Sequence, residues 1–566
     1  MVLKQRKSMI WRNIGILLLF LVLSCVYTIP VILNGEAVLK YLNDGPFHLS
    51  RMLSLANIWQ SPTNFNYFNH TGVPMGGFYP WLFLYPMYWI YQCVGSLSWS
   101  YYLYCAIVTF VTLVIAYYCS QKIVQSSRFS ILFAVMYTFS TYRASDIYYR
   151  HSMGEIIAMM FLPLILLGIY QIFYTKAKKW KALAIGMGCM AYSHILSLFM
   201  AGILVGAFLV IQLCRRAVHK STWWALMKAT ALGTLLSIGS LGPILIYTKS
   251  TALHLPDEHI LQYEVPNAMN LLTDSVNNLI GPTMSATIGI VVLVAFIIGM
   301  VLWKGSASFA KDSLALAALF LVMSTTLFPW QWFQDTPLKE LQFPWRLLML
   351  ATPLIALSFV MMIQRYSIRP IYLSLFILLI IGLHSSTIAH YAGGQMGRVE
   401  SRQFAKAQLE EKYTDQQLAT MVTGNLDGIV GQWDYSPKKA RDNKNFFIKH
   451  RVLVNGEEKS IEYQYTDNQI VFHVPAQRGD WIVLPVYRYL GERVSVNQTP
   501  VKSLKAKHGG TRVMALRDGM NRIQITYHYP KSVLASYAVS LMTLIGTIGY
   551  CIVMAIRNKM KNKHSA

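Results

Sequence analysis

Long apolar runs separated by short basic loops dominate the chain. A helix needs about 20 residues to cross the hydrocarbon core of a bilayer, and most of these runs approach that length. The pattern predicts about twelve helical spans. We expect them near Ile14–Leu33, Tyr101–Cys119, Phe129–Thr141, Gly154–Tyr174, Ala182–Ser193, Leu196–Leu213, Trp224–Ile246, Ala286–Trp303, Ser313–Phe328, Leu347–Met362, Ile371–Leu383 and Ala535–Ala555. The predicted fold class is therefore an all-α polytopic membrane bundle.

One apolar segment has to be assigned before the others can be oriented. Both Gly77–Val94 and Tyr101–Cys119 are apolar enough to cross. If both crossed, Lys122 and every later basic loop would face outward, against the tendency of basic loops to stay in the cytoplasm. We therefore expect only Tyr101–Cys119 to cross. The segment FYPWLFLYPMYWIY, which two prolines interrupt, should lie in the outer interface.

This assignment places both termini in the cytoplasm and one hydrophilic region, at about 389–530, outside. Its first part, Gln403–Thr420, has helical character, whereas its second part alternates apolar and polar residues, with turns expected at Asn455-Gly456 and Asp518-Gly519. We predict an extracytoplasmic β-sandwich there. The domain division is thus a membrane domain over 1–388, with outer juxtamembrane helices at about 46–95, the β domain over 389–530, and a final span with a basic tail over 531–566.

Composition agrees with a membrane protein. Hydrophobic residues make up 54% of the chain and charged residues 13%, whereas soluble domains carry about 25% charge. The 50 Lys and Arg outnumber the 25 Asp and Glu, but these cations sit between apolar runs, where they orient helices, and do not indicate nucleic-acid binding. None of the seven cysteines has a metal-ligand spacing.

The stretch YLNDGPFHLSR, directly after the first span, carries the strongest candidate chemistry. It places Asp44, His48 and Arg51 together at a membrane surface. Pro46 favours the start of a helix. The helix should carry an apolar stripe, with His48 and Arg51 off it, and lie along the interface. The stripe consists of Leu49, Met52, Leu53, Ala56 and Trp59. The alternative is that Asp44 merely caps this helix.

More ionisable residues fall at the outer ends of the predicted spans. They are Arg143, Asp146, Arg150, His151 and Glu155 in YRASDIYYRHSMGE, His194 after the fifth span, and Arg346 in LQFPWRLL. Ionisable groups at the margin of a membrane bundle are costly unless they serve a function. The alternatives are that the arginines reach lipid headgroups, that His194 only bonds a helix end, and that Asp146 or Glu155 caps the fourth span.

Together these residues suit transfer of a sugar from a lipid phosphate to an acceptor. Such a reaction needs a carboxylate to deprotonate the attacking hydroxyl and cations to hold the departing phosphate. We expect Asp44 to be the base and Asp146 or Glu155 a second acid. The predicted substrate- and phosphate-binding residues are His48, Arg51, Arg150, His194 and Arg346. If a metal is used, Asp44 and Asp146 are its candidate ligands.

Four motifs also carry a family resemblance. In chain order they are NDGPFHLSRMLSLANIW, GGFYPWLFLYPMYW, YRASDIYYRHSMGE and LQFPWRLL. They resemble the bacterial membrane family labelled 6-pyruvoyl-tetrahydropterin synthase-related and, more distantly, YfhO-like proteins, which resemble this chain also in an outer β-rich region before a final span. No histidine triplet has a zinc-site spacing, so we predict no pterin chemistry.

That family in turn resembles the GT-C glycosyltransferases, among them protein O-mannosyltransferases and the lipid A aminoarabinose transferase. The resemblance implies a catalytic acid in the first outer loop, which Asp44 matches, a polyprenyl-phosphate sugar donor and, in some members only, a divalent cation such as Mg²⁺ or Mn²⁺. Asn43 and Gly45 flank Asp44 where the family pattern has a second acid.

We therefore predict a multi-pass bacterial membrane glycosyltransferase that acts at the outer face on a lipid-linked sugar and a cell-envelope acceptor. The alternative is a non-catalytic membrane protein that binds, transports or helps to assemble lipid-linked envelope glycans.

Overall fold

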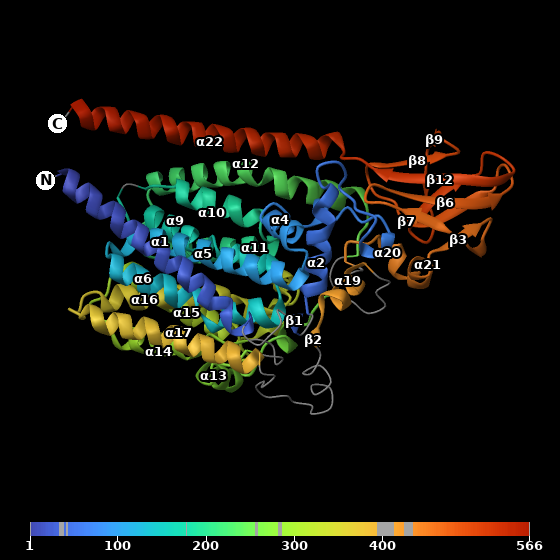
Figure 1. The fold of residues 1–566 in the computed structure, drawn as a ribbon. Coiled ribbons are helices and arrows are strands. Elements are labelled where there is room, and N and C mark those ends of the chain that lie inside the picture. The colour runs from blue at the N-terminus through green and yellow to red at the C-terminus, as the bar shows by residue number, and fades with distance from the viewer. Residues whose placement is uncertain are drawn as a thin grey trace.

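The computed structural model describes residues 2–32, 39–40, 43–176, 178–254, 258–280, 286–392, 412–423 and 434–564. A bundle of helices forms most of the molecule, and a β-rich region projects from one of its ends (Figure 1). Helix α1 (Val2–Ile32) and helix α22 (Lys531–His564) bring both chain termini to the other end. The predicted helical bundle and the β-rich region before the last helix are both present.

Eight helices or helix pairs among the described residues are long and apolar enough to cross a membrane, which agrees with a multi-pass protein. Besides α1 and α22 they involve α5 (Leu97–Val124), α8 (Met153–Met159) with α9 (Leu162–Phe173), α11 (Ile195–Cys214), α12 (Lys220–Ser250), α16 (Leu348–Ile363) and α17 (Pro370–Ala392). Shorter helices lie among them: α6 (Ser127–Thr138), α10 (Lys181–Ala191), α14 (Gly289–Val301) and α15 (Ser308–Met323). The count of twelve spans stays a prediction.

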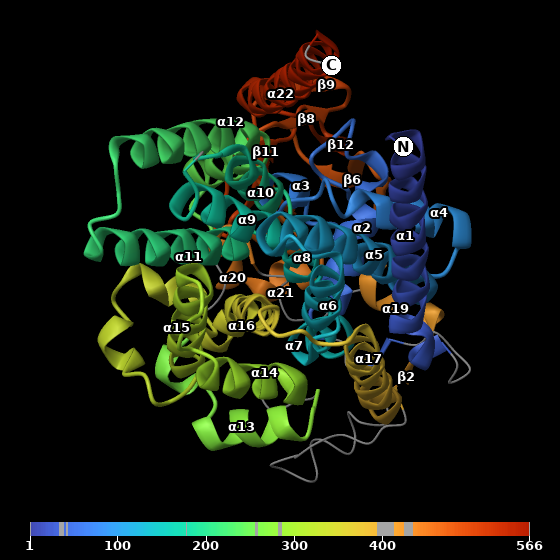
Figure 2. The same cartoon turned by 90° about the vertical axis from the view of Figure 1, so that its left-hand side faces the viewer.

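Small residues let several helices approach closely. A Cβ atom at Gly168 of α9 would lie 2.5 Å from the backbone nitrogen of Leu183 in α10, and one at Gly242 of α12 would lie 2.7 Å from the Cβ of Ser536 in α22. Figure 2 shows α22 at the periphery of the bundle, beside α12. Close contact through glycine and serine is the usual way that membrane helices associate.

The juxtamembrane helix differs from its prediction. Helix α2 (Gly45–Leu53) continues into the 3₁₀ turn η1 (Ser54–Asn57) and is covered on both faces. His48, Arg51 and Asn57 are buried, whereas Ala56 and Trp59 of the predicted apolar stripe are exposed. The reason is tertiary: helix α19 (Asp415–Thr423) packs on α2, and Asn57 Nδ2 donates to the carbonyl of Asp467 in the β-rich region at 2.9 Å.

Two five-stranded sheets form the β-rich region, and all their strand pairs are antiparallel. One has the order β10-β11-β7-β3-β4 and the other β5-β6-β12-β8-β9. The strands are β3 (Arg451–Val454), β4 (Glu457–Ser460), β5 (Tyr463–Tyr465), β6 (Gln469–Ala476), β7 (Trp481–Tyr487), β8 (Glu492–Val496), β9 (Thr499–Val501), β10 (Leu504–Lys505), β11 (Gly510–Met514) and β12 (Gly519–Tyr527). Buried residues of both sheets share one apolar core, as in a sandwich.

Both predicted turns lie at strand ends. Asn455 and Gly456 have φ of 50° and 95° and join β3 to β4 as a two-residue hairpin, and Gly519, with φ of 85°, begins β12. Residues 403–411 of the predicted helical stretch lie outside the described residues, and α19 covers its later part.

Hydrogen bonds join the β-rich region to the juxtamembrane segment. The Tyr487 amide donates to the Thr71 carbonyl at 2.8 Å, and the Tyr529 hydroxyl donates to the Ile58 carbonyl at 2.5 Å. The β-rich region therefore packs on the end of the bundle that carries α2 (Figure 1).

Candidate functional site

Four separate segments bring the three predicted acids, together with Arg150 and Arg346, to one end of the bundle. They are the start of α2, the one-turn π-helix Asp146–Arg150, the first turn of α8, and the turn Pro344–Leu347 that leads into α16. A π-helical turn is uncommon and often marks a functional site. Here it places Asp146 and Arg150 side by side, facing Glu155.

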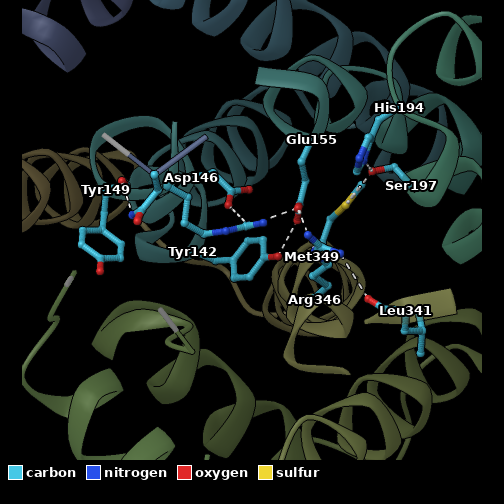
Figure 3. A network of polar contacts seen from close by, with 11 residues as sticks. Tyr142, Asp146, Tyr149, Glu155, His194, Ser197, Leu341, Arg346 and Met349 are labelled. Atoms are coloured by element: carbon cyan, nitrogen blue, oxygen red, sulfur yellow. Dashed lines mark hydrogen bonds and ion pairs between the residues drawn. The ribbon is translucent and has the colours of Figure 1, made fainter. Parts of the chain in front are cut away.

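Asp146, Arg150, Glu155 and Arg346 form an acid–arginine network (Figure 3). Arg150 Nη1 contacts Asp146 Oδ1 and lies 3.1 Å from Glu155 Oε2, and Arg346 Nε lies 3.9 Å from the same Glu155 oxygen. The Tyr142 hydroxyl donates to the other Glu155 oxygen. Both carboxyl groups are fully buried, and the network pairs these two acids with two guanidiniums, as buried charge requires. Burial raises the pKa of Asp146 well above its usual value, and Arg150 acts in the opposite direction.

Asp44 differs from the two acids of the network. It occupies the N-cap position of α2, yet its side chain makes no capping hydrogen bond, and it is partly exposed. Its amide donates to the Arg150 carbonyl at 3.1 Å, which fixes Asp44 beside the network. Although the residue is partly exposed, the protein around its carboxyl removes water from it and so raises its pKa, while Arg150 and Arg346 lower that pKa. The capping alternative does not account for its carboxylate.

Arg51 and His48 form a second pair on α2. Arg51 Nη1 lies 2.7 Å from His48 Nδ1, Arg51 Nη2 donates to the Pro80 carbonyl at 2.6 Å, and the guanidinium stacks 3.7 Å from the Tyr79 ring. Burial holds the pKa of His48 well below its usual value, so the ring is neutral and can accept from Arg51. Arg51 therefore ties α2 to the Tyr79–Pro80 turn.

His194 lies on the other side of Tyr79. Its ring stacks on the Tyr79 ring at a centroid distance of 6.0 Å, and its Nδ1 is 2.9 Å from Ser197 Oγ (Figure 3). Burial lowers the pKa of His194 to about 3, so it is neutral at physiological pH. Gly154 fits between both rings, because a Cβ atom there would lie 2.6 Å from the Tyr79 hydroxyl. His194 therefore contacts the Ser197 side chain in the first turn of α11 and makes no capping hydrogen bond to the helix backbone, and its role in substrate binding stays a prediction.

Arg346 donates hydrogen bonds to the loop that directly precedes it in the chain. Nη1 donates to the Leu341 carbonyl at 3.2 Å and to Gln342 Oε1 at 3.0 Å, and the guanidinium lies 4.8 Å from the Phe343 ring centroid. Nε is buried and has no hydrogen-bond partner among the described residues. Arg346 Nε therefore has the Glu155 carboxylate as an ion-pair partner at 3.9 Å, but it makes no hydrogen bond to a described group.

Two further residues of the same motif have other partners. Arg143 is fully buried and donates to the Thr138 carbonyl and to Thr109 Oγ1, so it does not reach lipid headgroups. His151 packs edge-on against the Tyr101 ring at 5.4 Å. Sequence reasoning overlooked Tyr142 and Gln342, although each lies within four residues of a predicted arginine.

Asp44 and Asp146 are the candidate metal ligands, and no described residue supplies a third ligand beside them. Within the described part of the chain, no group of three or more His, Cys, Asp or Glu side chains is arranged to hold an ion.

No protein-family model matches the sequence, and no curated protein matches it. The resemblance of the four motifs to the 6-pyruvoyl-tetrahydropterin synthase-related and YfhO-like proteins therefore remains an interpretation of the sequence.

The chain is similar to several solved structures, two of which are described below. One is the arabinofuranosyltransferase AftD from Mycobacteria, with 14% identity and a TM-score of 0.39 over 65% of this chain and 26% of that one. The other is ArnT from Cupriavidus metallidurans bound to undecaprenyl phosphate, with 10% identity and a TM-score of 0.37 over 72% of this chain and 77% of that one. The chain thus spans about a quarter of the AftD structure.

Proposed function

We propose that the protein is an integral membrane glycosyltransferase of GT-C type. It transfers a sugar from a polyprenyl-phosphate donor to a cell-envelope acceptor on the extracytoplasmic face, with both of its own termini in the cytoplasm. One observation carries the proposal: Asp44 is a partly exposed acid, not used for capping, beside a network of two acids and two arginines.

Asp44 is the base in this reaction. The acceptor hydroxyl gives its proton to the Asp44 carboxylate while its oxygen bonds to the anomeric carbon of the sugar. The bond between that carbon and the phosphate oxygen breaks, and the electron pair leaves with the polyprenyl phosphate. The raised pKa of Asp44 makes it a better base than an exposed carboxylate.

Arg346 binds the phosphate. Its Nε, which makes no hydrogen bond to a described group, is a donor for a phosphate oxygen, and its positive charge stabilises the charge that develops as the bond breaks. The sequence predicted that Arg150 binds phosphate, but here we assign it a positioning role, because Asp146 and Glu155 already bind its guanidinium. Asp146, Glu155 and Arg150 position the site, as do His48, Arg51 and His194.

The proposal predicts that Asp44→Asn removes an envelope sugar modification. Loss of a general base lowers the rate about 100-fold or more. The measurement compares envelope glycan composition in cells that make the wild-type protein, the variant, or neither. Asp415→Asn is a matched control, because Asp415 lies at the same end but accepts bonds from the Ser98 amide and hydroxyl.

Normal glycan composition in Asp44→Asn, at wild-type protein level, would contradict the role of Asp44 as the base. If removal of the whole protein changes the envelope but Asp44→Asn does not, the alternative of a non-catalytic protein that binds, transports or helps to assemble lipid-linked glycans is favoured.

A further inference from the structure

The loop before α16 contains a strained residue that contacts Arg346. Gln342 has φ of 59° and ψ of −54°, and the Phe343 amide donates to the Leu341 carbonyl across it at 2.6 Å. These values define the rarer form of the γ-turn, which is strained for any residue with a Cβ atom. Such strain persists only where the surrounding structure imposes it, and it gathers at functional sites.

The segments on either side of Gln342 are rigid, and they impose the γ-turn at this residue. Thr336 caps the 3₁₀ turn Pro337–Leu341 before it, and Pro344 follows Phe343, which restricts Phe343 to extended backbone. The turn places two acceptors, the Leu341 carbonyl and Gln342 Oε1, on the same Arg346 nitrogen. A glycine would fit this backbone without strain, yet it would lack the side-chain acceptor.

The Gln342 carboxamide carries a donor as well as an acceptor. Its oxygen accepts from Arg346 Nη1, which leaves its Nε2 group as a donor on a side chain that is bonded to Arg346. Gln342 is partly exposed, whereas Arg346 is buried. A carboxamide whose oxygen is bonded to a guanidinium is a stronger donor at its nitrogen, because chained hydrogen bonds polarise one another.

We propose that Gln342 binds the same phosphate group as Arg346, by donating from Nε2 to a phosphate oxygen, and that the strained turn exists to place it there. This inference rests on the proposed function for the identity of the phosphate, which there belongs to a polyprenyl lipid. Gln342 is thereby a substrate-binding residue, in addition to those predicted from the sequence.

Gln342 could act in two ways, by positioning Arg346 or by donating to phosphate, and two different substitutions are needed to distinguish them. Gln342→Glu keeps an acceptor for Arg346 but replaces the donor with an anionic oxygen, whereas Gln342→Met removes both. If Gln342 only positioned Arg346, the glutamate variant would behave like the wild type. If Gln342 donates to phosphate, the glutamate variant should be at least as impaired as the methionine variant.

The experiment measures lipid binding to the purified full-length protein in detergent, with undecaprenyl phosphate as the probe and undecaprenol as the uncharged comparison. We expect Gln342→Met to weaken undecaprenyl phosphate binding about tenfold, and Gln342→Glu by that much or more. Undecaprenol binding should not change. Competition by inorganic phosphate should also weaken in both variants, because the recognised group is the phosphate itself.

Gln342→Gly tests the strain. It should unfold at the same or a higher temperature than the wild type, because glycine adopts this backbone without strain, and yet bind undecaprenyl phosphate as weakly as Gln342→Met. Gln334→Glu is the matched control: its amide accepts from the Leu261 nitrogen and donates to the His259 carbonyl, away from Arg346. This control should lower stability without changing lipid binding.

Wild-type binding in Gln342→Glu would overturn the proposal, as would a wild-type protein that does not prefer undecaprenyl phosphate to undecaprenol. Failure of the proposed function has a different signature, since Asp44→Asn would then leave the envelope glycan unchanged while the Gln342 variants still lost phosphate binding.

Discussion

At the scale of single residues, the site separates acids that hold the structure from the acid proposed to react. Asp146 and Glu155 are fully buried and contact Arg150, and Glu155 also lies near Arg346. Asp44 has no ion pair of 4.0 Å or less with any described cation and is partly exposed. Loss of charge at the two kinds of position should have different consequences.

Glu155→Gln should therefore destabilise the protein strongly, and Asp44→Asn should not. The first change leaves two buried guanidiniums with one carboxylate, which costs about 3 kcal/mol or more. The second leaves the network intact and should change stability by about 1 kcal/mol at most. Thermal unfolding of both variants in the same detergent checks this prediction. Equal losses of stability would contradict the distinction between the two acids.

At the scale of elements, close helix packing positions the segments that carry the site. Helix α8 supplies Glu155 and continues into α9, which lies against α10 at Gly168. The atom facing Gly168 belongs to backbone, which cannot rotate away as a side chain can. The geometry of the network therefore depends on this contact between α9 and α10.

Gly168→Ala should separate α9 from α10 and lower stability by about 1–3 kcal/mol, as overpacking in a close-packed interior does. Gly202→Ala in α11 is the matched control, because no atom lies within 4 Å of a Cβ placed there. Thermal unfolding in detergent measures both. An unchanged unfolding temperature in Gly168→Ala would show that α10 can move without cost.

At the scale of the whole molecule, the β-rich region and the juxtamembrane segment meet at buried histidines. His450 Nε2 lies 3.1 Å from Asn69 Oδ1, and the His70 ring stacks on Tyr465 at 3.9 Å. Burial lowers the pKa of His450 to about 4 and also lowers the pKa of His70. Both rings are therefore neutral in the folded protein near pH 7.

Acidification should loosen this junction. A histidine whose folded pKa is depressed gives stability that is complete above its unfolded pKa, near 6.5, and is lost as the pH falls toward 4. For His450 the loss is about 3 kcal/mol at most. Hydrogen exchange of peptides covering 65–72 and 448–466, measured at pH 7 and pH 5, checks the prediction. His450→Gln should reduce the pH dependence, and an unchanged dependence would contradict the role of His450.

Much of the architecture follows from local sequence. Apolar runs of span length predict the long helices because the hydrocarbon core fixes their minimum length. Alternating residues with the Asn455-Gly456 pair predict β-strands and a hairpin, since few residues adopt the positive φ that this turn needs. The gathering of ionisable residues at one end follows from the positions at which those residues interrupt or end the apolar runs.

The roles of these residues depended on the tertiary structure. The sequence predicted an interfacial helix with an exposed polar face, but α19 and the β-rich region cover that face, and both contacts come from distant parts of the chain. It also grouped Arg51, Arg150 and Arg346 as equivalent phosphate ligands. Only the fold shows which carboxylates and carbonyls already occupy each guanidinium, because hydrogen-bond satisfaction is a property of partners brought together from remote segments.

The sequence by itself thus determined that the protein is a multi-pass helical membrane protein with a β-rich region before its last helix, and which residue types are available for chemistry, because these properties depend on local periodicity and composition. The tertiary structure alone decided that Asp44 is the acid left outside the acid–arginine network, that Arg346 Nε makes no hydrogen bond to a described group, and that Gln342 occupies a strained turn beside Arg346. Burial and pairing decide these properties, and both require the assembled fold.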